Sequence, residues 1–170
     1  MAVPLIVTAQ MGKADQAWAD DLRKRHFPAA RNFLPAHITL FHHLPPGHVD
    51  EIRHRLSSRA REGPRPAASL KGLISLGRGV AYEVRSPELL AIREELADAL
   101  TGLLVPQDMG TPRLHITIQN KVEPAIAKAL LAQLAAGFQP RPLDISELVL
   151  WRYLGGPWDE VQRWRFSGVR

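Results

Sequence analysis

Two short segments of the chain alternate polar and apolar residues in the same order: histidine, aliphatic, threonine, aliphatic. They are His37-Ile38-Thr39-Leu40 and His115-Ile116-Thr117-Ile118. Ile, Leu and Thr favour an extended backbone, so the pattern predicts two β-strands. Successive side chains of a strand point to opposite faces. Each strand is therefore expected to bury its aliphatic face and to present an imidazole beside a hydroxyl on the other.

The spacing of apolar residues along the rest of the chain predicts helices and further strands. Prolines and glycines between the periodic segments mark their ends. We expect helices over 15–26, 49–61, 87–104 and 124–136, and strands over 3–9, 36–43, 68–76, 80–85, 113–119, 143–154 and 158–166. The third helix has a clear start, because Ser86 is a good N-cap and Pro87 suits the first helical position.

Two sets of these elements repeat each other in the order strand, helix, histidine strand, helix. The first set covers 3–61 and the second 80–136, and outside the motifs they share little residue identity. We interpret the repeat as structural self-similarity and predict an α+β fold of two pseudo-symmetric lobes. Each lobe would be an antiparallel sheet with flanking helices, and a central cleft would bear the two histidine strands. The whole chain, 1–170, would form this single bilobed domain.

The composition is that of a globular protein, with 45% hydrophobic and 23% charged residues. A chain of this length can bury a core without disulfide or metal staples. Cysteine is absent, which excludes disulfides and thiolate metal sites and fits a cytoplasmic protein. The apolar start of the chain lacks a basic segment and is interpreted as a strand, not a signal peptide. No apolar run reaches membrane-spanning length, so we expect no membrane partner. We also expect the protein to be cytoplasmic and monomeric.

The net charge of +5 comes with basic side chains that are mostly arginine. Arginine pairs bidentately with phosphate, so the charge favours a phosphate-bearing or polyanionic partner. A basic surface that contacts only solvent explains the charge equally well, and the charge alone does not decide between them.

The two motifs supply the groups that phosphodiester chemistry needs. Two histidines that titrate near neutrality can serve as base and acid in one reaction, and two hydroxyls can donate hydrogen bonds to phosphate oxygens. The set favours attack on a strained cyclic phosphodiester, in which one histidine takes a proton from water and the other protonates the leaving ribose oxygen. For hydrolysis we assign the base to His115 and the acid to His37. The repeat leaves an exchange of these roles open.

Nothing in this chemistry requires a metal ion or another cofactor. Five further histidines cluster in the first third of the chain: His26, His42, His43, His48 and His54. They fall on a strand end, a loop and a helix, without paired ligand spacing or a nearby cysteine. We therefore do not expect a zinc site.

The paired motifs resemble those of the 2H phosphoesterases, in the branch called bacterial 2′-5′ RNA ligase-like or HXTX proteins. The length, the motif separation and the bilobed pattern are also similar, as are the stretches 76–82 and 154–158. The resemblance implies an RNA-processing enzyme: a phosphodiesterase that opens 2′,3′-cyclic phosphates of RNA ends or small nucleotides to 2′-phosphates, with 2′-5′ RNA ligase activity as a further option. It also implies four catalytic residues, His37, Thr39, His115 and Thr117.

Six further residues are candidates for substrate contact: Phe41, Arg78, Tyr82, Arg113, Gln119 and Lys121. Phe41 shares a strand face with His37 and could stack on a base. Arg113, Gln119 and Lys121 share the alternation of the second motif and could line the rim. A residue in any of these positions is more often an ordinary core or solvated residue, and that alternative stays open for each.

Two other features bear on substrate contact. Some members of the resembled family carry an arginine shortly after the second motif, where this chain has Gln119-Asn120-Lys121. Phosphate contact there would fall to Lys121 or Gln119, with weaker geometry than arginine. Arg78 and Tyr82 could reach the cavity from the 68–85 hairpin. The residues Trp151, Tyr153, Trp158 and Trp164 are interpreted as a packed sheet and not as a base-binding platform.

Two other functions stay open at this point. One is a non-catalytic RNA- or nucleotide-binding module of the same fold, although the presence of all four motif residues argues against it. The other is a hydrolase of a different phosphodiester, such as a cyclic ADP-ribose phosphate or a 2′-5′-linked oligonucleotide. Turnover of a small substrate panel, with and without EDTA, distinguishes these possibilities.

Overall fold

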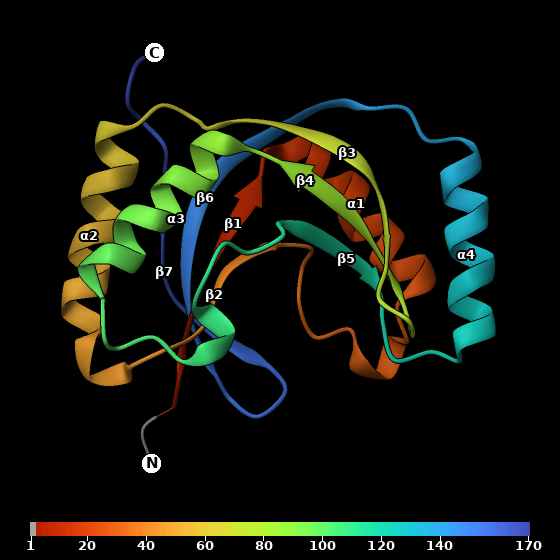
Figure 1. Cartoon of the computed structure of the whole chain (residues 1–170), viewed down its shortest axis with the longest axis horizontal. Coiled ribbons are helices and arrows are strands. Elements are labelled where there is room, and N and C mark those ends of the chain that lie inside the picture. The colour runs from red at the N-terminus through yellow and green to blue at the C-terminus, as the bar shows by residue number, and fades with distance from the viewer. Residues whose placement is uncertain (1–2) are drawn as a thin grey trace.

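The elements follow one another in the predicted order in the computed structural model, which describes residues 3–170 (Figure 1). The strands are β1 (Leu5–Met11), β2 (Ile38–Leu44), β3 (Ala67–Ser75), β4 (Val80–Arg85), β5 (His115–Gln119), β6 (Arg141–Tyr153) and β7 (Trp158–Arg165). The helices are α1 (Lys13–His26), α2 (Val49–Glu62), α3 (Pro87–Ala99) and α4 (Pro124–Ala136). Met1 and Ala2 of the predicted domain lie outside the described residues.

The strands form an antiparallel sheet in the order β1-β2-β5-β4-β3-β6-β7, and β6 also pairs with β1. The long strand β6 bonds to β3 through residues 141–144 and to β1 through residues 145–152. The predicted α+β class is confirmed. The predicted division into lobes with separate sheets is not seen, because the ladders join the strands into one network. The repeat is visible inside that network as the equivalent pairs β1–β2 and β4–β5.

Successive side chains of β1 point to opposite faces of the sheet and belong to two different apolar clusters. Leu5, Val7 and Ala9 belong to the main core, together with the buried faces of the helices. Ile6 belongs to a smaller cluster with Val149 and Trp151. The main core holds the sheet and helices together, and the smaller cluster lies on the other side of β1.

Helix α3 starts where the sequence predicts and ends earlier. The Leu89 backbone N–H donates to Ser86 Oγ at 3.1 Å, which caps the helix, and Pro87 is the first helical residue. The predicted end at Leu104 is wrong, because the helix stops at Ala99. Leu100 is fully buried at the cap, and Gly102 turns the chain with a positive φ of 85°.

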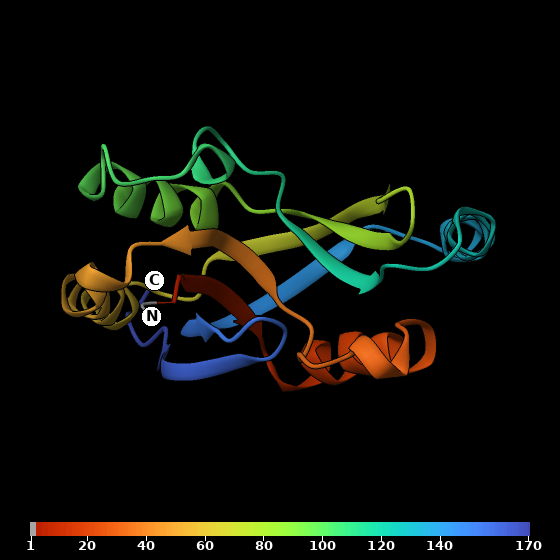
Figure 2. The same cartoon turned by 90° about the horizontal axis from the view of Figure 1, so that it is seen from below.

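Helices α1 and α3 lie on opposite sides of the strands β2 and β5, which pass between them (Figure 2). Helix α1 packs against β5 and β1, and α3 packs against β3 and α2. Within residues 3–170, no helix has the length and apolar character needed to cross a bilayer.

Candidate active site

The two histidine strands are neighbours in the sheet. Ile38 of β2 pairs with Ile116 of β5, and both side chains are fully buried. In an antiparallel pair, opposite residues point to the same face, and the next residues point to the other. This register brings His37 level with Thr117 and Thr39 level with His115. The four polar side chains therefore share one face of the sheet, where all four are half-buried.

Both histidines are oriented by the same kind of hydrogen bond. His37 Nδ1 lies 2.8 Å from the carbonyl oxygen of Pro35, and His115 Nδ1 lies 2.7 Å from that of Arg113. A carbonyl oxygen can only accept, so Nδ1 carries the proton in each neutral ring. Nε2 is then the free nitrogen in both, able to accept a proton or, when protonated, to donate one.

His37 has an apolar neighbour and a lowered pKa. Its ring centroid is 4.9 Å from the ring of Trp158, which extends from β7. Burial is the main cause that lowers the pKa of His37 from 6.5 to about 4, partly opposed by the hydrogen bond to Pro35. The charges of Arg23, His115 and His42 lower this pKa further. At neutral pH His37 is therefore a neutral imidazole.

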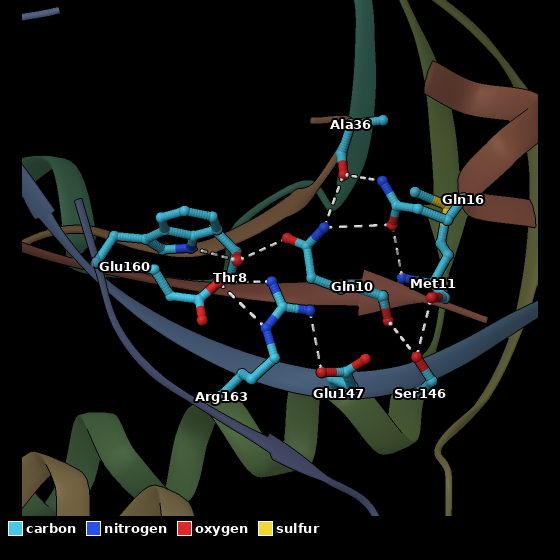
Figure 3. Close-up of polar contacts among 10 residues, drawn as sticks. Thr8, Gln10, Met11, Gln16, Ala36, Ser146, Glu147, Glu160 and Arg163 are labelled. Carbon is cyan, nitrogen blue, oxygen red and sulfur yellow. Dashed lines mark hydrogen bonds and ion pairs between the residues drawn. The ribbon is translucent and has the colours of Figure 1, made fainter. Parts of the chain in front are cut away.

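A polar network fixes the backbone that enters the first motif (Figure 3). The Ala36 N–H donates to Asp20 Oδ1 at 2.7 Å. The Ala36 carbonyl accepts from Gln10 Nε2 at 2.9 Å and from Gln16 Nε2 at 2.8 Å. Both polar backbone groups of the residue before His37 are therefore held by side chains of β1 and α1.

The same network continues to the aromatic side chains beside His37. Trp151 Nε1 donates to Thr8 Oγ1 at 2.9 Å, and Thr8 Oγ1 donates to Gln10 Oε1 at 3.0 Å. The Trp151 ring in turn contacts Trp158, with centroids 5.9 Å apart. Trp158 therefore packs against Trp151, whose own position is fixed by the hydrogen bond to the buried Thr8.

His115 has charged neighbours instead of an aromatic one. Glu83 of β4 is its direct partner across the β4–β5 ladder, so the two side chains share a face. Glu83 Oε1 accepts from Arg113 Nε at 2.9 Å, and this hydrogen bond lowers the pKa of Glu83. An ion pair therefore borders the second histidine.

Two predicted substrate contacts are wrong because the alternation breaks just after each motif. Thr8 pairs with Thr39 but Val7 pairs with Phe41, so one residue is bulged out of β2. The bulge turns Phe41 into the core, where it is fully buried and unable to stack on a base.

The second motif has the same bulge at the equivalent place. Ala81 pairs with Thr117 but Val80 pairs with Gln119. Gln119 therefore shares the face of the buried Val80 and is itself only 3% exposed. The prediction that Gln119 lines the rim is wrong for the same reason as that for Phe41.

Tyr82 also faces away from the motif side chains. Its partner in the ladder is Ile116, which points opposite to His115 and Thr117. Tyr82 is buried against Trp18 and Phe138 instead, and lines a separate cavity of about 430 Å³ between α1 and α4. The prediction that it reaches the motif site is wrong.

Three predicted contact residues keep positions compatible with that role. Arg113 is exposed beside His115. Arg78 is exposed, and its Nε donates to the carbonyl of Val122 at 3.1 Å, just beyond β5. Lys121 is exposed in the same turn, with a positive φ of 63°. Their contact with substrate stays a prediction.

Sequence reasoning assigned Trp158 to the packed sheet and missed its contact with His37. The contact depends on where the β6–β7 hairpin lies relative to the segment that enters β2, which no local pattern reports. An aromatic residue just after the turn Gly155-Gly156-Pro157 was the available signal. The structure places it half-buried beside the motif histidine.

The histidines of the first third do not gather into a metal site. No group of three or more His, Asp or Glu side chains suited to a metal ion occurs in the part of the chain that the structure describes. His42 is instead tied to the buried carboxylate of Asp108, with 3.2 Å between Nδ1 and Oδ1.

Comparison with known families gives one match that covers most of the chain. The family model described as the 2′-5′ RNA ligase superfamily matches residues 12–157. None of the curated proteins compared with the chain matches it significantly.

Solved structures with the same fold are found at low sequence identity. TT0787 of Thermus thermophilus is 16% identical, with a TM-score of 0.65 over 98% of this chain and all of its own. E. coli LigT complexed with 3′-AMP is 14% identical, with a TM-score of 0.60 over 97% of this chain and 98% of its own. A structure described as a phosphoesterase is 18% identical, with a TM-score of 0.62 over 98% of this chain and 99% of its own. These likenesses concern the fold.

Proposed function

The chain belongs to the 2′-5′ RNA ligase superfamily, and we propose that it is a phosphodiesterase that opens 2′,3′-cyclic phosphates of RNA ends or nucleotides to 2′-phosphates. The observation that carries the proposal is the shared face of His37, Thr39, His115 and Thr117, with both imidazoles oriented alike. Two free Nε2 atoms and two hydroxyls are what an in-line displacement at phosphorus needs. No metal ion is required for the proton transfers.

The proposed hydrolysis divides the proton transfers between the two rings. Neutral His37 takes a proton from water through Nε2 as the water oxygen bonds to phosphorus. His115, protonated at Nε2, gives its proton to the 3′-oxygen as the P–O3′ bond breaks. Thr39 and Thr117 donate to the non-bridging oxygens, where charge builds. If a 5′-hydroxyl took the place of water, its oxygen would bond to phosphorus as the same P–O3′ bond breaks, giving a 2′-5′ linkage; this would account for ligase activity.

This assignment is the reverse of the one made from the sequence. The low pKa of His37 and its contact with Trp158 favour the neutral ring at working pH, which suits a base. Each transfer is worth about 10²- to 10⁴-fold in rate.

The surroundings of His37 suit a nucleoside substrate. Trp158 presents a half-buried ring beside the imidazole, and such a ring can stack on a base at about 1–3 kcal/mol per base. E. coli LigT has been crystallised with 3′-AMP and with ATP, which supports nucleotide binding by this fold.

The test is turnover of a nucleoside 2′,3′-cyclic phosphate in the presence of EDTA, with the product identified by ³¹P NMR. We expect a 2′-phosphate product from the wild type at the same rate with and without EDTA. Persistence of the cyclic phosphate, while a nucleoside 2′-phosphate still binds, would show a binding module instead. A 3′-phosphate product would reject the assignment of the leaving oxygen.

A further inference from the structure

The two histidine strands separate from each other as soon as they have met. Ile38 and Ile116 are their one pair in the ladder, so the backbone groups that follow on each strand need other partners. Two buried arginines supply them. Arg23 Nη1 donates to the carbonyl of Thr117 at 2.9 Å, and Arg93 Nε donates to the carbonyl of Leu40 at 3.1 Å.

Each arginine crosses from one half of the repeat to the other. Arg23 belongs to α1 in the first half and holds the second motif strand. Arg93 belongs to α3 in the second half and holds the first motif strand. Figure 2 shows these helices on opposite sides of the two strands, as the crossed contacts require. The arrangement is that of a pseudo-twofold pair.

Each arginine also anchors the segment that leads into the motif of its own half. Arg23 Nε donates to Asn32 Oδ1 at 3.1 Å, in the loop before β2. Arg93 Nη1 donates to the carbonyl of Gly110 at 2.8 Å, and Nη2 donates to that of Asp108, in the loop before β5. A single guanidinium therefore joins the entry of one motif strand to the edge of the other.

Both guanidinium groups also lie over an aromatic ring, although the two rings do not occupy equivalent places in the repeat. Arg23 lies over the Phe27 ring at 4.2 Å from its centroid, and Arg93 lies over the Phe41 ring at 4.4 Å. Phe41, which the sequence suggested for a nucleobase, thus supports an arginine.

Among the described residues, the charges of this pair are buried without a direct ion pair. Burial lowers the pKa values of both guanidinium groups, and the nearby carboxylates of Asp20 and Asp108 only partly oppose this lowering. Arg23 is 4% exposed and Arg93 is 3% exposed. Within residues 3–170, neither guanidinium makes an ion pair with a carboxylate. A buried unpaired cation is costly unless its hydrogen bonds are needed, and only a flat, forked donor bridges two segments at once.

We propose that Arg23 and Arg93 are positioning residues that set the separation of the two motif strands, and so hold His37 and His115 on opposite sides of one phosphorus atom. The inference rests on the proposed function. Each guanidinium donates a hydrogen bond to a backbone carbonyl that a neighbouring strand would bind in a regular ladder. Regular pairing of β2 with β5 would instead draw the two imidazoles together.

The experiment replaces each arginine by lysine, which keeps the positive charge but loses the planar, forked set of N–H donors. The control is Arg141→Lys: Arg141 also lies over an aromatic ring, that of Trp18 at 4.7 Å, and donates to the Pro142 carbonyl. It makes no hydrogen bond to either motif strand. Three quantities are measured: kcat and KM for a nucleoside 2′,3′-cyclic phosphate, the unfolding midpoint, and the imidazole ¹⁵N signals of His37 and His115.

We expect Arg23→Lys and Arg93→Lys each to lower kcat by about a hundredfold, the effect of a misplacement near 1 Å, with a small change in KM. Each variant should shift the ¹⁵N signals of both histidines, including the one in the other half. Arg141→Lys should leave both kcat and the signals unchanged. Unchanged kcat in either lysine variant, or a loss that follows only the fraction of unfolded protein, would overturn the proposal.

A milder variant covers the case in which an arginine variant does not fold. Asn32→Ala leaves Arg23 bonded to Thr117 but releases the loop before β2, and should lower kcat several-fold with the fold intact. Unchanged kcat there counts against the proposal. If the wild type turns over no cyclic phosphate, the proposed function fails, and the ¹⁵N signals alone then decide: shifts of both histidines support the positioning role, and unshifted signals reject it.

Discussion

The pair β1–β2 and the pair β4–β5 carry the same motif in the same frame but in different surroundings. In both, the motif histidine bonds through Nδ1 to the carbonyl two residues earlier, and a bulge follows the threonine. In both, a buried arginine from the other half holds the strand just after the motif. What the halves share is thus the placement of two imidazoles, which a reaction with matching proton transfers requires.

The halves differ in what lies beside each histidine. Ala9 pairs with Ile38 and Tyr82 pairs with Ile116, so the next residues, Gln10 and Glu83, are equivalent. The first half has a neutral amide there, and the second a carboxylate. Trp158 packs only against His37 among the two motif rings. In the proposed mechanism the common frame would supply the catalytic geometry, and the unlike neighbours would give the two rings different roles.

The largest effect is expected from removing either histidine. His37→Ala and His115→Ala should each lower kcat by about 10²- to 10⁴-fold on a nucleoside cyclic phosphate. A nucleoside p-nitrophenyl phosphodiester needs no acid for its leaving group, so on it His115→Ala should recover most activity and His37→Ala should not. The control is His43→Ala, which changes an exposed histidine of β2. The opposite order of recovery would restore the roles assigned from the sequence.

The threonines should have similar effects in the two halves. Thr39→Val and Thr117→Val keep the strand shape and remove one donor to phosphate, so each should cost about 10²-fold in kcat. Steady-state kinetics on the cyclic substrate measures this. Thr101→Val, an exposed hydroxyl outside the sheet, is the control. A loss confined to one threonine would show that the two halves do not share the phosphate.

Acid should weaken the fold through His37. Its pKa is about 4 in the folded chain and 6.5 ordinarily, so on acidification the unfolded chain takes up the proton first. Stability is therefore lost as pH falls from 6.5 towards 4, by roughly 3 kcal/mol at most. Denaturant unfolding at several pH values should show a smaller loss in His37→Gln, with His43→Gln as the control. An equal loss in His37→Gln and the wild type would contradict the lowered pKa.

The smallest effect concerns the two bulges. The first half places a phenyl ring at the bulge and the second places Gln119, whose Oε1 is buried with no hydrogen-bond partner among residues 3–170. Gln119→Leu should stabilise the protein by about 1 kcal/mol, because an unsatisfied buried acceptor is removed. Urea unfolding measures the change, with the exposed Gln133→Leu as the control. A destabilised Gln119→Leu would indicate that the amide has a role.

The elements and the motif face could be predicted from the sequence, because both depend on local periodicity. His37 and Thr39 alternate with buried aliphatic residues as expected. The misplacement of Phe41 and Gln119 has one cause: a single bulged residue reverses the alternation, and nothing in the local pattern marks it. Trp158 and the crossed arginines were missed because their contacts join segments far apart in the chain.

The central claim is that one phosphate engages both motif histidines, and a single titration tests it. A nucleoside 2′-phosphate is added to protein labelled with ¹⁵N at histidine, and the Nε2 signals of His37 and His115 are followed. The account predicts that both signals change together along one binding curve with one Kd. A response from only one histidine, or two curves with different Kd values, would contradict it.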